Sequence, residues 1–275
     1  MKYKNYSNKY IIITGASLGL GKALAKRFAL EGCNLILLSL PGEGLANYSR
    51  MLANEYGVKI LHFETDLCKG ENIKEFADWV LNQKVQIAGL VNNAGLGGSA
   101  LFEQTSISLI DTMLLVNVRA LTLLTRYFLP ALKAQEHSFI LNVSSIAAFK
   151  PMPFKMVYPA SKAFVYSFSV GLGEELKDTG VHVAVMHPGP MNTSEDNEAR
   201  IGKHGFMGKG AWLTVDDVAD IGVSKMLAGD KVIIPGVYNK VIIRLLKFIP
   251  RIFAMPMIYK VLSKEVFSES ERQSI

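Results

Sequence analysis

The chain is 275 residues long, with a formal net charge of +6 and a pI of about 9.1. Hydrophobic residues make up 49% and charged residues 20%, a composition that supplies a large core and excludes a disordered or fibrous chain. The first 230 residues contain no basic block, and Cys33 and Cys68 lack CxxC spacing, so we expect no nucleic-acid partner, no disulfide framework and no metal site.

Short apolar runs alternate with longer amphipathic segments along most of the chain. Helices are expected at residues 22–31, 72–81, 109–132 and 160–177. This alternation calls for parallel strands joined by right-handed crossovers. We therefore expect one α/β domain, a Rossmann-like doubly wound parallel sheet of about seven strands with helices on both faces. The expected strands are Tyr10–Ile13, Leu35–Ser39, Lys59–Phe63, Ile87–Val91, Phe139–Val143, Val181–Met186 and Val232–Ile234.

A glycine-rich turn follows the first expected strand and precedes a helix. It reads Thr14-Gly15-Ala16-Ser17-Leu18-Gly19-Leu20-Gly21. Glycines let the backbone approach a pyrophosphate closely, and free N–H groups at the helix N-terminus meet its charge. Taken alone, such a turn is also compatible with an ordinary strand-to-helix loop, so further motifs are needed.

Several short motifs follow at the ends of later strands. Asp66 and Leu67 come after the third strand, and Asn117 lies inside an expected helix, where asparagine is a mediocre helix former. An aspartate such as Asp66 is about as often a turn or cap residue as a ligand contact. Two longer motifs are Asn92-Asn93-Ala94-Gly95 after the fourth strand and His187-Pro188-Gly189-Pro190-Met191-Asn192-Thr193 after the sixth.

The strongest signal is a YxxxK pattern, Tyr158-Pro159-Ala160-Ser161-Lys162, with Ser145 lying 13 residues before the tyrosine. An i, i+4 pair shares one helix face, so both side chains should enter one cleft. Carbonyl reduction needs a proton donor opposite the hydride, and a phenol of pKa about 10 must be tuned for this. An ammonium roughly 4 Å away would contribute on the order of 4 kcal/mol at an effective dielectric of about 20, enough, together with the positive charge of an oxidised nicotinamide, to stabilise a tyrosinate when an alcohol is oxidised.

In combination, the motifs from about Lys9 to Gly236 resemble the short-chain dehydrogenase/reductase family, in particular its 3-oxoacyl and hydroxysteroid-type reductases. The resemblance implies hydride transfer between NAD(P) and a carbonyl or alcohol. It implies Tyr158 as acid-base residue, Ser145 as donor to the substrate oxygen, Lys162 as holder of the nicotinamide ribose, and Asn117 as the residue that distorts its helix and binds a water linked to the lysine.

The same resemblance implies where the cofactor lies. The glycine turn would hold the pyrophosphate, Asp66 would lie beside the adenine, and Thr193 would embrace the nicotinamide amide. The expected cofactor-binding residues are Gly15, Ser17, Leu18, Gly19, Leu20, Gly21, Ser39, Asp66, Leu67, Asn93, Ala94, Gly95, Tyr158, Lys162, Pro188, Gly189, Met191 and Thr193.

The choice between the two nicotinamide cofactors is read at the end of the second strand. Ser39-Leu40-Pro41-Gly42-Glu43 offers neither the acidic side chain that takes the ribose 2′-OH of NAD nor the arginine that takes the 2′-phosphate of NADP in the usual place. Ser39 could donate to a 2′-phosphate, whereas Glu43 could turn back and favour NAD. We favour NADP(H) over NAD(H).

An apolar substrate is expected, because Phe149, Met152, Phe154, Met156 and Val157 are placed to form an apolar wall. Plain core packing explains such residues equally well. The expected partner is a small-molecule ketone or alcohol, and the expected assembly is a homodimer or homotetramer.

Two other functions share the fold. A nucleotide-sugar epimerase has the YxxxK pattern but typically a GxxGxxG turn and a larger C-terminal domain, and neither is present here. A non-catalytic dinucleotide sensor or scaffold would keep the nucleotide pocket, and the intact Ser145, Tyr158 and Lys162 argue against it.

The chain divides into a dinucleotide-binding domain, residues 1–240, and an amphipathic C-terminal extension, residues 241–275. A polar, glycine-rich stretch at 191–210 is a lid candidate. In the extension, apolar Val241, Leu245, Phe248 and Ile252 share one helical face and Arg244, Lys247 and Arg251 another, and Pro250 and Pro256 are expected to break any long helix. Docking on a membrane surface is conceivable, and packing on the substrate mouth or a neighbouring subunit is at least as well supported.

No signal-type apolar core and no run of about 18 uncharged apolar residues is present, so we expect a cytoplasmic protein without a spanning helix.

Overall fold

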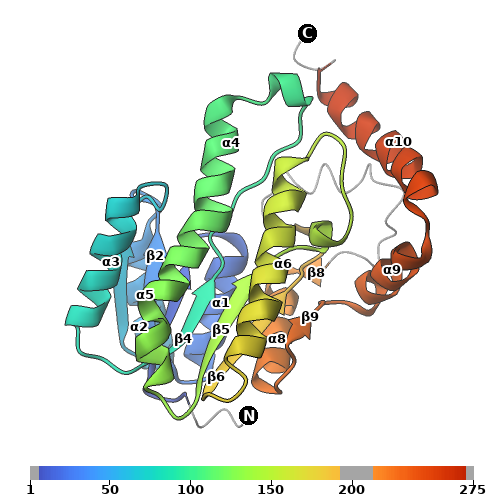
Figure 1. Cartoon of the computed structure of the whole chain (residues 1–275). Helices are drawn as coiled ribbons and strands as arrows, with labels where there is room; N and C mark the ends of the chain where they lie inside the picture. The colour runs from blue at the N-terminus through green and yellow to red at the C-terminus, as the bar shows by residue number, and fades with distance from the viewer. Residues whose placement is uncertain (1–5, 193–212, 271–275) are drawn as a thin grey trace.

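A computed structural model describes residues 6–192 and 213–270 of the chain. Seven parallel strands form one sheet in the order β3-β2-β1-β4-β5-β6-β9 (Figure 1). Their bounds are β1 Tyr10–Thr14, β2 Asn34–Ser39, β3 Ile60–Glu64, β4 Ile87–Asn92, β5 Ser138–Val143, β6 Val181–Met186 and β9 Val232–Ile233. The expected doubly wound sheet is thereby confirmed, with every strand close to its predicted place.

Helices cover both faces of the sheet (Figure 1). One face is packed by α1 Gly19–Leu30, α2 Leu45–Tyr56 and α8 Val215–Leu227, and the other by α3 Gly70–Asn82, α5 Leu121–Lys133 and α6 Val157–Glu175. Helix α2 lies outside the helices predicted from the sequence. It is bounded by Gly44 and Gly57, which take φ values of 74° and 67° at its caps.

The strand order reverses between β1 and β4, which is where an open α/β sheet forms a crevice at the carboxyl ends of its strands. The glycine-rich turn follows β1 and the Asn92-Asn93-Ala94-Gly95 motif follows β4, so both lie at this crevice. The fold therefore brings together two motifs that are almost 80 residues apart in the sequence.

The helix predicted at 109–132 is composite. It consists of α4 Ile107–Leu114, a π-helical segment Leu115–Ala120, and α5. By length and a mean hydropathy of 1.7, the stretch 107–133 would suffice to cross a membrane. Within it, Leu124, Phe128 and Leu132 form the face of α5 that packs in the core against the sheet.

The C-terminal part contains α9 Val237–Phe248 and α10 Arg251–Ser270, which form one flank of the molecule (Figure 1). Pro250 separates the two helices, as predicted. The prediction that Pro256 also breaks the helix is wrong, because α10 continues through it. A proline removes one backbone donor, and Pro256 lies on an exposed side of α10, where the loss is tolerated.

Candidate active site

The turn between β1 and α1 is tight enough to require glycine. Gly15 takes φ 64°, and a Cβ on Gly21 would lie 1.9 Å from the carbonyl oxygen of Gly15. The turn and the N-terminus of α1, which begins at Gly19, can therefore approach a diphosphate as expected of this sequence.

The motif that follows β4, Asn92-Asn93-Ala94-Gly95, is hydrogen-bonded to this turn. Asn93 Nδ2 donates to the carbonyl oxygens of Thr14 at 2.9 Å and Gly15 at 3.1 Å. The Thr14 hydroxyl in turn accepts the backbone N–H groups of Asn93 and Ala94, both at 3.0 Å. These bonds hold the two strand ends at a constant separation.

Asn117 lies in the π-helical segment, so the helix is distorted where the family resemblance implied. Its amide nitrogen donates to the Leu96 carbonyl at 2.9 Å and to Ser161 Oγ at 3.0 Å, and its oxygen accepts the Leu96 N–H at 3.0 Å. Asn117 thereby ties the chain after β4 to α6. A π segment of this kind frequently marks a functional site.

Tyr158, Lys162 and Asn117 meet against the same backbone. A Cβ on Gly95 would lie 3.0 Å from both Lys162 Nζ and Asn117 Oδ1, and a Cβ on Gly97 would lie 2.9 Å from the Tyr158 ring. Lys162 Nζ donates to the Val143 carbonyl at 3.0 Å and lies 5.8 Å from the centre of the Tyr158 ring. The structure thus brings the predicted tyrosine and lysine together beside Gly95 and Gly97.

Burial shifts the pKa of both members of this pair. Burial raises the pKa of Tyr158, and a hydrogen bond with Ser145 lowers it by less. Burial also lowers the pKa of Lys162 to about 8. In this structure the amine is directed at the Val143 carbonyl, and desolvation is the largest cause of both shifts.

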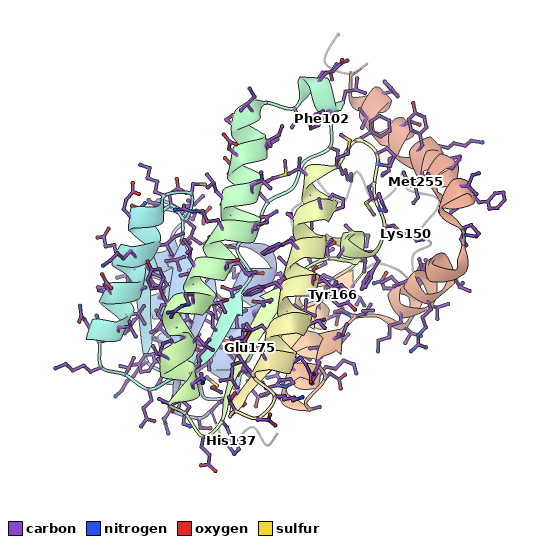
Figure 2. All side chains as sticks on the ribbon, viewed as in Figure 1. Phe102, His137, Lys150, Tyr166, Glu175 and Met255 are labelled. Atoms are coloured by element: carbon purple, nitrogen blue, oxygen red, sulfur yellow. The ribbon has the colours of Figure 1, made fainter. Side chains whose placement is uncertain are left out.

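His187 had no role in the sequence-based expectation and turns out to support Ser145. It is fully buried, and its Nδ1 donates to the Ser145 carbonyl at 3.0 Å. Burial lowers the pKa of His187 to about 4, so the ring is neutral with its proton on Nδ1. Its ring packs between Phe149 and Tyr166, the latter labelled in Figure 2, at centroid distances of 4.5 Å and 4.9 Å. In the sequence, only the position of His187 directly before Pro188 pointed to a role for this residue.

The segment after β2 holds an acidic group near the glycine turn. The Ser17 hydroxyl donates to the Glu43 carboxylate. Ser39 is buried and its hydroxyl donates to the Leu40 carbonyl at 3.0 Å. The Glu43 side chain therefore points back to the glycine turn. This is the arrangement, left open by the sequence, that would favour NAD.

The carboxylate of Asp66 accepts a hydrogen bond from the backbone of its own loop. Its Oδ1 accepts the N–H of Cys68 at 2.9 Å, as in an Asx turn, beside the buried Leu67. This bond engages one carboxylate oxygen of Asp66.

The motif after β6 packs against the C-terminal helices. The Pro188 carbonyl accepts the N–H of Ile146 at 3.0 Å. A Cβ on Gly189 would lie 2.5 Å from Asn239 Nδ2 at the start of α9, so any side chain there would displace the Asn239 amide. Met191 pairs through β7, Met191–Asn192, with β8, Leu213–Thr214. Thr193 and most of the expected lid lie outside the described residues.

Four of the five residues expected to form one apolar wall, all except Met152, are found in different surroundings. Phe149 packs on His187, Phe154 contacts Tyr259 of α10 at 5.2 Å, and Met156 and Val157 line a shallow pocket on the outer side of α6. The single wall is therefore wrong, because the loop 146–156 turns these side chains towards different neighbours.

Comparisons with known proteins agree with this geometry. A family model described as short chain dehydrogenase matches residues 9–203. The chain is 34% identical over 185 residues to the very-long-chain 3-oxoacyl-CoA reductase of Anas platyrhynchos, covering 65% of this chain and 58% of that protein. It is 31% identical over 185 residues to the 3-oxoacyl-[acyl-carrier-protein] reductase FabG of Aquifex aeolicus, covering 67% of this chain and 75% of that protein.

Solved structures share the fold. The chain superposes on a 7beta-hydroxysteroid dehydrogenase with a TM-score of 0.77 at 22% identity, covering 90% of this chain and 95% of that one. It superposes on a short-chain dehydrogenase from Sphingobium yanoikuyae in complex with NADPH with a TM-score of 0.74 at 27% identity, covering 88% of this chain and 97% of that one.

Proposed function

Because the chain belongs to the short-chain dehydrogenase family, we propose that it transfers a hydride between a bound nicotinamide cofactor and a ketone or secondary alcohol. The observation that carries this proposal is the meeting of Tyr158, Lys162 and Asn117 at the crevice beside the glycine turn. A bound nicotinamide would supply or accept the hydride.

Side chains of this protein donate the proton and the hydrogen bond that the substrate oxygen receives. Tyr158 is protonated, since burial raises its pKa, and its hydroxyl delivers a proton to the developing alkoxide during reduction. Ser145, positioned through its carbonyl by His187, donates a hydrogen bond to the same oxygen. The glycine turn and Lys162 would hold the cofactor.

The test compares Tyr158→Phe with Tyr166→Phe, a matched loss of a hydroxyl elsewhere on α6. Cofactor oxidation is followed with a panel of apolar ketones and 3-oxoacyl thioesters. Tyr158→Phe is expected to lose at least about 100-fold in kcat, the usual share of one acid-base group, and to keep cofactor binding. Turnover absent from both the wild type and the variant would identify a non-catalytic dinucleotide sensor instead, and turnover unchanged in Tyr158→Phe would exclude Tyr158 as the acid-base residue.

We propose NADP(H) as the preferred cofactor. Strand β2 ends without a carboxylate, and two relatives above 25% identity are described in complex with NADPH and NADP. Glu43, bonded to Ser17, is the acidic group that opposes a 2′-phosphate. Glu43→Gln is therefore expected to raise kcat/KM for NADPH relative to NADH by roughly tenfold, as for one charge pair removed. A wild-type enzyme that strongly prefers NADH overturns the proposal.

The proposed substrate is apolar, a 3-oxoacyl compound, a steroid-like ketone or a similar ketone. The similarity to two 3-oxoacyl reductases supports this class. We also propose a homodimer or homotetramer, since Leu114 of α4, Met156 before α6 and Phe164 of α6 are exposed around a shallow pocket. A cytoplasmic location is proposed too, in line with the free thiols of Cys33 and Cys68.

A further inference from the structure

The positive charge of this chain is concentrated in one short segment. Residues 231–264 contain seven Lys and Arg and no Asp or Glu, whereas the other 241 residues carry 23 basic and 24 acidic side chains. The whole net charge of +6 therefore comes from the segment that builds α9 and most of α10. Its cations are Lys231, Lys240, Arg244, Lys247, Arg251, Lys260 and Lys264.

The same two helices turn apolar side chains outwards. On α9, Val237, Val241 and Leu245 follow one another at four-residue spacing and are 77%, 47% and 60% exposed. Ile243 on the opposite side is buried. Arg244 is exposed and follows Val237 by two helical turns, so it lies within this apolar face.

Helix α10 repeats this arrangement. Ile252 and Phe253 are 75% and 69% exposed, and the exposed Lys260 lies two turns beyond Phe253 on the same side. Ala254 on the other side is buried. Both helices thus present large apolar side chains interspersed with cations, where a surface helix normally presents polar ones.

Contacts on their inner side hold the helices to the site. Lys150, labelled in Figure 2, donates through Nζ to the Ile249 carbonyl at 3.5 Å, between α9 and α10. Phe154, which has a left-handed φ of 67°, contacts the rings of Tyr259 and Phe267 at 5.2 Å and 6.1 Å. Helices α9 and α10 therefore pack on the loop between Ser145 and Tyr158.

We propose that the outer face of α9 and α10 docks on an anionic lipid bilayer. A helix lying in the plane of a membrane inserts apolar side chains into the headgroup boundary while its cations meet anionic lipids. A second copy fits this face poorly, because a two-fold interface would bring the same cations of both subunits together. The near-neutral remainder of the chain leaves α9 and α10 as the side that an anionic surface attracts.

The experiment is co-sedimentation of the full chain with vesicles of phosphatidylcholine alone or with one third phosphatidylglycerol. The protein is expected to sediment with the anionic vesicles, and added salt is expected to weaken binding. Leu245→Ser should reduce partitioning about tenfold through lost apolar burial. Lys260→Gln should reduce it about fivefold, because one cation near an anionic surface contributes about 1 kcal/mol.

The matched controls lie on other surfaces. Leu30→Ser removes a leucine that is 63% exposed on α1, and Lys133→Gln removes an exposed cation on α5. Both should partition like the wild type. Failure to sediment with anionic vesicles, or equal losses in the controls, overturns the proposal. A change in molar mass of Leu245→Ser without vesicles, measured by light scattering, also overturns it, since it identifies a self-interface.

Discussion

At the scale of single residues, the buried amine of Lys162 serves the proposed catalysis but lowers the free energy of unfolding. Burial lowers its pKa to about 8, whereas an unfolded lysine titrates near 10.5. Between these values the unfolded chain binds more protons than the folded one, so the free energy of unfolding rises with pH through this window. Below pH 8 the folded state carries the whole cost of burying the charged amine. This cost is about 3 kcal/mol, at roughly 1.4 kcal/mol per pKa unit.

We therefore predict that Lys162→Met stabilises the protein at pH 7 by about 1–3 kcal/mol and abolishes turnover. The increase of stability between pH 8 and 10.5 should flatten in this variant. Urea unfolding at several pH values measures both effects, with Lys133→Met as an exposed control that should change neither. Destabilisation by Lys162→Met would mean that the bond from Nζ to the Val143 carbonyl outweighs desolvation.

At the scale of elements, the turn from β1 into α1 is the least tolerant part of the site. A methyl group on Gly21 would overlap the Gly15 carbonyl, and backbone atoms cannot yield as a flexible side chain can. The turn must then open, which separates the N–H groups that would meet a diphosphate.

Gly21→Ala is predicted to destabilise the protein by about 2 kcal/mol, as overpacking does, and to weaken cofactor binding at least tenfold. Thermal unfolding and cofactor titration by fluorescence measure the two effects. Gly171→Ala is the matched control, because its Cβ meets nothing within 4 Å on α6 and alanine is the better helix former. Equal behaviour of the two variants would show that the turn relaxes freely.

At the scale of the whole molecule, the described part of the chain has two apolar surfaces with different electrostatics. The face of α4 and α6 exposes Leu114 (45%) and Phe164 (40%), whereas the flank of α9 and α10 is strongly basic. We expect self-association on the first face, since an isologous interface excludes concentrated like charge.

Phe164→Glu is predicted to reduce the molar mass in solution to that of a monomer, as read by light scattering. The reason is that a two-fold axis would bury two like charges against apolar surface. Leu81→Glu on α3, where the leucine is 44% exposed, is the control and should leave the mass unchanged. A wild type that is already monomeric contradicts the proposed oligomer.

The sequence alone determined the sheet, its order of motifs and the residues that meet at the crevice. Apolar runs of strand length and the spacings of the glycine turn and of Tyr158 and Lys162 are local patterns, so they can be read without coordinates. Asn117 was recognisable for a related reason, as a poor helix former inside a helix.

Tertiary structure alone decided the remaining features. Glu43 reaches Ser17 across 26 residues, His187 holds Ser145 across 42, and Phe154 turns from the expected wall towards α10. The ionisation of Tyr158 and Lys162 likewise follows from burial, which depends on every neighbour packed around them. Periodicity places a side chain on a face of its own element, but only packing determines what that face meets.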